Sequence, residues 1–164
     1  MEPLNKYIHE YRKQMKKGNI QKAYRGLMAY LMDLRTHFSR KYHDFVPGSM
    51  YHGYMDMSYF PIFPNLLKKR KLKIAVVLIH DTIRFEVWLV GYNKQIQTKY
   101  WKLFKENDWN KYHTPSTMKD ADYIIEYTLT DNPDFSDLDS LTTLIEKKTM
   151  NFVKDIEVFL SKHE

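Results

Sequence analysis

The sequence contains no cysteine, which excludes disulfide bonds, thiolate nucleophiles and cysteine metal ligands. Glycine is scarce as well, with five residues in 164, and no Walker loop, dinucleotide-binding fingerprint or nucleophile elbow is present. No apolar run approaches the roughly 20 residues of a membrane span, and the N-terminal segment lacks the apolar core of a signal peptide. We therefore expect a soluble cytoplasmic protein with no bound cofactor and no membrane partner.

Histidine is present but is not arranged for metal binding. The seven histidines are scattered, and none has the close spacing of a zinc motif. His52, Asp56 and His80 could meet on adjacent strands, but single histidines in proteins are more often hydrogen-bonded structural residues. We predict no metal site.

Aromatic residues make up 15% of the chain, and tyrosine is the commonest of them. Tyrosine suits surfaces that are apolar on one side and wet on the other. A chain of 164 residues fits one folded unit, and no proline- or glycine-rich linker divides it. We expect a single domain over residues 1–164.

Hydrophobic periodicity predicts an α+β fold with the element order ααβββαβα. The first two helices are joined at Gly18, and this short link predicts an antiparallel helical hairpin. The four strands form a mostly antiparallel sheet on which the helices pack. The predicted helices are 3–17, 20–42, 93–106 and 137–160, with a single turn at 65–69, and the predicted strands are 49–60, 73–80, 83–92 and 123–130.

The segment from Lys71 to Lys105 reads as two strands around a tight turn at Asp81-Thr82, followed by a helix. One face of this hairpin is uniformly apolar and should meet helices. The other face carries charge in the second strand. The predicted register there places Ile79 opposite Arg84, Val77 opposite Glu86 and Ala75 opposite Trp88.

Arg84, Glu86 and Trp88 are therefore the candidate ligand site, with Tyr54 or Asp56 of the first strand nearby. A carboxylate in apolar surroundings needs a partner, or its pKa rises. The three residues either line a pocket or form a structural ion pair, because structural networks perturb charged groups too. No catalytic residue is predicted.

Charge is divided unevenly along the chain. Residues 1–111 carry 21 basic and 9 acidic side chains, whereas residues 112–164 carry 5 and 11. The basic part could bind a polyanion, and lysines and arginines at 68–73 and 94–105 lie among aromatic residues that could stack on bases. Alternatively, the two parts neutralise each other or are solvated surfaces. Nucleic-acid binding is possible but not favoured.

The order αβββαβ in residues 20–130 resembles the core of restriction-endonuclease-like proteins. That chemistry needs an aspartate and a glutamate to hold a divalent metal, and a lysine two residues after the glutamate. Here Asp81 would be the upstream carboxylate, and Glu86 is followed at that spacing by Trp88 instead of lysine. The resemblance implies a non-catalytic relative or a different active site.

The stretches LNKYIHEYRKQ, KAYRGLMAYLMDLRTHF, GYMDMSYF and FEVWLVGYNKQIQTKYWKLF are similar to a family of small uncharacterised bacterial proteins known only as a domain of unknown function. The resemblance spans nearly the whole chain. It implies a bacterial cytoplasmic protein and brings no activity or catalytic residue with it.

Two hypotheses for function remain open. The first is a non-enzymatic binding or interaction protein, in which an aromatic groove around Tyr51, Tyr54, Tyr59 and Trp88 takes a small ligand or a protein partner. The alternative is a degenerate nuclease-like protein or another enzyme that uses carboxylates around Glu86. The first is favoured because the sequence shows no complete catalytic set.

Overall fold

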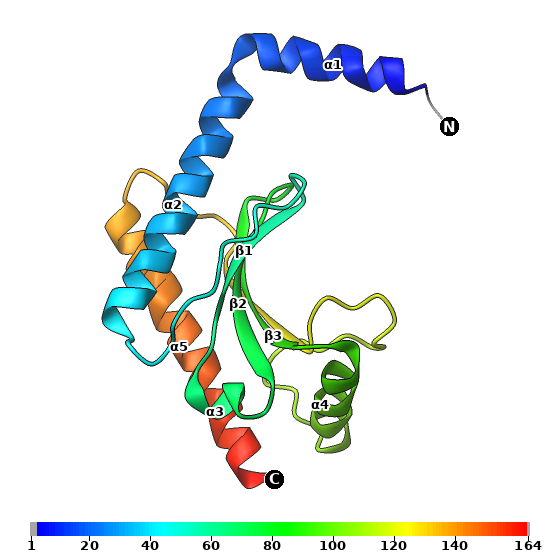
Figure 1. Cartoon of the computed structure of the whole chain (residues 1–164), viewed down its shortest axis with the longest axis vertical. Coiled ribbons are helices and arrows are strands. Elements are labelled where there is room, and N and C mark those ends of the chain that lie inside the picture. The colour runs from blue at the N-terminus through cyan, green and yellow to red at the C-terminus, as the bar shows by residue number, and fades with distance from the viewer. Residues whose placement is uncertain (1–2, 164) are drawn as a thin grey trace.

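The computed structural model describes residues 3–163 and has the predicted α+β architecture (Figure 1). A four-stranded antiparallel sheet is combined with five helices, and the predicted single turn after the first strand is helix α3. None of the helices in this part of the chain is both long and apolar enough to cross a membrane. The elements are α1 Leu4–Lys17, α2 Asn19–Lys41, β1 Met57–Ile62, α3 Asn65–Lys68, β2 Leu72–Ile79, β3 Arg84–Gly91, α4 Lys94–Glu106, β4 Ile125–Thr130 and α5 Leu138–Lys162.

The sheet is a meander in which the spatial order β1-β2-β3-β4 follows the chain. The predicted register between β2 and β3 is confirmed, since Ile79 pairs with Arg84, Val77 with Glu86 and Ala75 with Trp88. The connection is longer than the predicted two-residue turn. It runs from His80 to Ile83, and Ile83 adopts a positive φ of 48°.

Helices α2 and α5 cover one face of the sheet (Figure 1). The main core lies between these two helices and the sheet, and it contains the apolar side chains of alternate strand residues, most of which are fully buried. Helix α4 joins this core at the end of the sheet, where Phe104 stacks on Phe159 of α5 with ring centroids 4.4 Å apart. Asn93 caps α4 and Asp137 caps α5 through their side-chain oxygens, as expected for helix starts.

The opposite side of the sheet, which we call the open face, carries a second and smaller apolar cluster. Ala75, Val77 and Trp88 are buried at its centre. Their cover comes from half-buried neighbours on the same face, not from α2 or α5, which lie on the other side (Figure 1). Those neighbours are Met57, Tyr59, Ile79, Val90 and Tyr123.

The two N-terminal helices form as predicted, but they do not pack as an antiparallel hairpin. Helix α1 leaves the start of α2 at a large angle and projects away from the sheet (Figure 1), and none of its residues is buried. Gly18 makes the corner in the left-handed conformation, with φ of 80°. Asn19 is the first residue of α2, and no side chain caps the start of this helix.

The first predicted strand, 49–60, is wrong in its extent. Strand β1 begins only at Met57 and continues through Pro61 to Ile62. Residues 45–51 instead turn back beside β1, and Tyr51 exchanges two backbone hydrogen bonds with Tyr59. Pro61 is tolerated because β1 is an edge strand of the sheet.

Candidate ligand site on the open face

Glu86 is a buried carboxylate in the middle of the open face, with only 3% of its surface exposed. Arg84 donates from Nε to Glu86 Oε2 at 2.6 Å, and the indole Nε1 of Trp88 donates to Oε1 at 2.8 Å. All three residues lie on the same side of β3 because side chains alternate along a strand. The structure thus brings together the three residues predicted from the sequence. Both oxygens of the buried carboxylate are satisfied, and the Trp88 ring is fixed in place.

A small pocket lies on the open face beside the Trp88 ring. Its volume is about 190 Å³, and Met57, Tyr59, Ala75 and Val90 form most of its apolar wall. Two residues of opposite charge, Lys73 and Asp122, complete the lining. The floor comes from β2 and the sides from β1 and β3, so the pocket is built on the rigid part of the fold.

A second glutamate lies next to Glu86 and Trp88 on the neighbouring strand, β4. Glu126 of β4 lies opposite Trp88, and Thr128, opposite Glu86, donates a 3.3 Å hydrogen bond to Glu126. Burial, followed by the negative charge of Glu86, raises the pKa of Glu126 above its ordinary value. Two negative charges on one apolar face repel each other, so a proton is favoured on the carboxylate with the weaker partners, which is Glu126.

Tyr123 and His113 complete this end of the open face. The Tyr123 ring lies 5.2 Å from the Trp88 ring, and burial and the charge of Glu126 raise the pKa of its hydroxyl. His113 pairs with Glu126 through two backbone hydrogen bonds, which join the loop between α4 and β4 to the outer edge of the sheet.

Tyr54 and Asp56 are not brought into contact with Glu86. Tyr54 is 89% exposed, and the Asp56 side chain accepts a hydrogen bond from the Tyr54 backbone within its own turn. Tyr51 and Tyr59 of the predicted aromatic groove do lie against each other, with tilted rings whose centroids are 5.1 Å apart. The aromatic side chains of the open face are therefore Tyr51, Tyr59, Trp88 and Tyr123, without Tyr54.

Sequence reasoning missed Glu126, Tyr123 and His113. The alternation of Glu126, Thr128 and Thr130 against the apolar Ile125, Tyr127 and Leu129 was the available signal for a polar strand face. That signal does not say which strand β4 pairs with, since α4 and a loop separate β4 from β3. Only the pairing of β3 with β4 places Glu126 beside Glu86 and Trp88.

The three residues considered for a metal site have other roles. His80 Nε2 lies 2.8 Å from the hydroxyl of Ser58, the same hydroxyl donates to the His52 carbonyl oxygen, and the Asp56 carbonyl accepts from the His80 backbone. Burial lowers the pKa of His80. Within residues 3–163, no group of three or more histidine, aspartate or glutamate side chains is placed to hold a metal ion.

Another buried carboxylate, Glu146 of α5, lies outside the open face and links α5 to α2. Lys41 and Tyr42 contact its Oε1 at 2.6 Å, and His37 Nε2 lies 2.8 Å from Oε2. Burial alone would raise the pKa of Glu146, but these hydrogen bonds outweigh it and lower the pKa to about 2. The ion pair with Lys41 joins the acidic C-terminal third to the basic part, as does the pair of Lys111 with Asp155.

The fold and the open face define an α+β protein with a small aromatic pocket beside a buried glutamate. The model of a family described as a domain of unknown function, DUF7000, matches residues 4–160, and the chain belongs to this family. A search of curated proteins and a search of solved structures return no significant match.

Proposed function

We propose that the protein is a binding module whose open face takes a flat apolar or aromatic group into the pocket between Tyr59 and Trp88. The observation that carries this proposal is the pocket itself, whose apolar walls stand on three paired strands. Ligand sites are commonly concave and apolar, with a few polar groups that orient the ligand.

The chemistry of the pocket favours a ligand of about one ring with polar substituents. The volume of about 190 Å³ is small, and the fixed Trp88 ring offers a rigid surface for stacking. Lys73 and Asp122 could pair with an anionic and a cationic substituent, respectively. We place this activity in the cytoplasm of a bacterial cell, in line with the family resemblance and the lack of cysteine.

The proposal can be tested by ¹⁹F NMR with a set of fluorinated one-ring and two-ring aromatic fragments. Ala75→Leu should abolish fragment binding because the added carbons fill the pocket from its floor. The control is Tyr54→Ala, which removes an exposed tyrosine outside the pocket and should leave binding unchanged. If Ala75→Leu folds and binds fragments as well as the unmodified protein does, the pocket is not the site.

The carboxylate pair favours a second candidate function, an enzyme in which Glu126 acts as a general acid. A glutamate whose pKa is raised stays protonated closer to neutral pH and can donate its proton there. Arg84 pairs with Glu86, so the two carboxylates would have different roles. Screening ester and glycoside substrates with Glu126→Gln as the matched inactive variant tests this candidate; equal turnover by both proteins would remove it.

A further inference from the structure

Helix α1 exposes a continuous apolar stripe. Four of its apolar residues are well exposed: Leu4 at 70%, Tyr7 at 56%, Ile8 at 41% and Tyr11 at 63%. They recur at spacings of three and four residues and so share one side of the helix. A surface helix with this pattern normally packs its stripe on a core, yet no residue of α1 is buried. The stripe therefore lacks a counterpart within the described chain.

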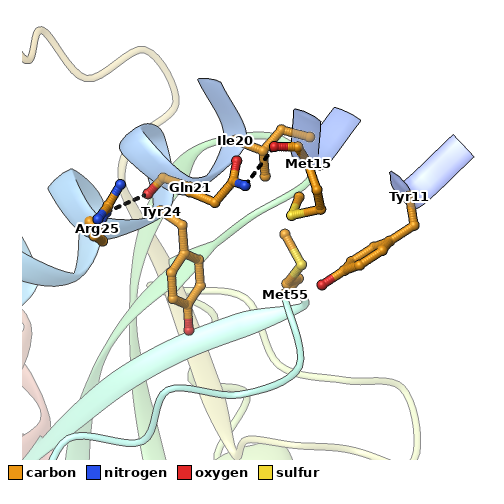
Figure 2. A pocket seen from close by; sticks show the side chains of 7 residues that line it. All are labelled: Tyr11, Met15, Ile20, Gln21, Tyr24, Arg25 and Met55. Atoms are coloured by element: carbon orange, nitrogen blue, oxygen red, sulfur yellow. Dashed lines mark hydrogen bonds between the residues drawn. The ribbon is translucent and has the colours of Figure 1, made fainter. Parts of the chain in front are cut away.

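The stripe leads into a groove at the elbow between α1 and α2. Figure 2 shows the side chains of Met15, Ile20 and Met55 gathered there, with Tyr24 and the Tyr11 ring at its two ends. The groove has a volume of about 380 Å³. Gln21 fixes the elbow by donating a 2.8 Å hydrogen bond to the Met15 carbonyl. A mainly apolar groove thus lies beside an exposed apolar helix.

The stripe is symmetric about its own centre. Leu4, Ile8, Tyr11 and Met15 are spaced by four, three and four residues, so Leu4 and Met15, and likewise Ile8 and Tyr11, are equally far from the point between residues 9 and 10. When two such helices pack antiparallel around a two-fold axis, Leu4 of one meets Met15 of the other, and Ile8 meets Tyr11. Both Met15 and Tyr11 line the groove. A second copy of α1 would therefore place its Leu4 and Ile8 at each groove, as a two-fold interface requires.

The charges on α1 are compatible with this arrangement. Given 3.6 residues per turn, Lys6, Lys13 and Lys17 fall on the side of the helix opposite Leu4 and Ile8, whereas Arg12 and Lys16 fall beside the stripe. Antiparallel pairing through the stripe therefore keeps Lys13 and Lys17 on the outer sides of the helix pair and does not bring them together.

We propose that two copies of the chain dimerise by packing their α1 helices antiparallel, with Leu4 and Ile8 of each copy in the elbow groove of the other. This interface is separate from the pocket on the open face and does not depend on the proposed function. The contact is confined to two short helices and two grooves, so the dimer should dissociate on dilution.

Sedimentation velocity between about 1 and 100 μM tests the proposal, because a modest helical interface should give an affinity in that range. The unmodified protein should shift from monomer to dimer as concentration rises. Ile8→Glu should weaken dimerisation at least tenfold, because it places a charge in the apolar seam. The matched control, Lys13→Glu, also adds a negative charge to α1, but on its far side, and should dimerise like the unmodified protein. A monomer at every concentration, or equal weakening by both variants, would overturn the proposal.

The lack of native cysteine allows a direct test of the pairing geometry. When Leu4→Cys protein is mixed with Met15→Cys protein and oxidised, a disulfide should join the two variants, because paired cysteines need closely approaching Cα atoms. Lys13→Cys in place of Met15→Cys should give several-fold less crosslinked product. Equal crosslinking by the two mixtures would contradict the antiparallel register. Ile8-dependent binding to phosphatidylcholine vesicles containing phosphatidylglycerol, by protein that stays monomeric, would replace the dimer with a membrane contact.

Discussion

Trp88 donates its indole hydrogen to Glu86, two residues earlier on the same strand, at a nitrogen-to-oxygen distance of 2.8 Å. One buried carboxylate thereby fixes both an aromatic ring and, through its other oxygen, the guanidinium of Arg84. The rigidity of the pocket wall and the charge state of the open face thus depend on the same side chain.

Replacing Arg84 with methionine should destabilise the protein by about 1–3 kcal/mol, the usual cost of leaving a buried acceptor without a partner. The Arg84 side chain is 38% exposed, which places the expected loss below that of a fully buried pair. The double variant Arg84→Met/Glu86→Gln should lose less stability, because the glutamine side chain carries no charge and its oxygen still accepts a hydrogen bond from Trp88. Urea unfolding measures both, with Arg12→Met as an exposed control. If Arg84→Met leaves the free energy of unfolding unchanged, the pair of Arg84 and Glu86 is solvated.

The stability of the protein should fall in acid because of Glu146. Its pKa in the folded state is about 2, below the ordinary value of 4.5, so its stabilising effect is complete above pH 4.5 and is lost as the pH falls toward 2. The difference between the two pKa values corresponds to about 3 kcal/mol of stability. Glu146→Gln should remove most of this pH dependence in unfolding experiments between pH 7 and pH 2.5. Glu106→Gln, at an exposed position, should retain it.

Glu126 should show the opposite pH dependence. Its folded-state pKa is raised, so its contribution to stability is complete below its ordinary pKa and is lost as the pH rises through the folded value. Glu126→Gln should therefore gain stability relative to the unmodified protein between pH 4 and pH 7. Carboxyl ¹³C NMR can follow the titration directly. Glu86→Gln should lower the Glu126 pKa, and an unchanged titration curve in that variant would exclude coupling between the two glutamates.

The core between the sheet and α5 should be sensitive to truncation of Phe152. This side chain is fully buried, and removing a buried phenyl ring typically costs about 3–5 kcal/mol. Val158 lies on the same helix but is 46% exposed, so Val158→Ala should change the free energy of unfolding by less than about 1 kcal/mol. Similar losses for both variants would show that burial in this core does not set the stability.

The sequence was sufficient to predict the hairpin of β2 and β3 with its register, because two apolar strands around a short polar turn have few alternatives. Arg84, Glu86 and Trp88 followed from that register. The position of α1 could not be predicted, since an apolar stripe indicates only that a helix face is suited to burial, not that it is buried. Tyr54 was assigned to the groove by the same logic, but it lies in the turn before β1 and its side chain is 89% exposed.

Both outer edges of the sheet are occupied by segments without long strands of their own. Gly48 and Tyr51 donate backbone hydrogen bonds to Pro61 and Tyr59 of β1, and His113 exchanges two with Glu126 of β4. An unprotected edge strand would recruit further strands and promote aggregation. With these backbone groups already used, growth of the sheet from chain to chain is hindered. Specific assembly should then proceed through side chains, which can be changed by single substitutions without altering the sheet.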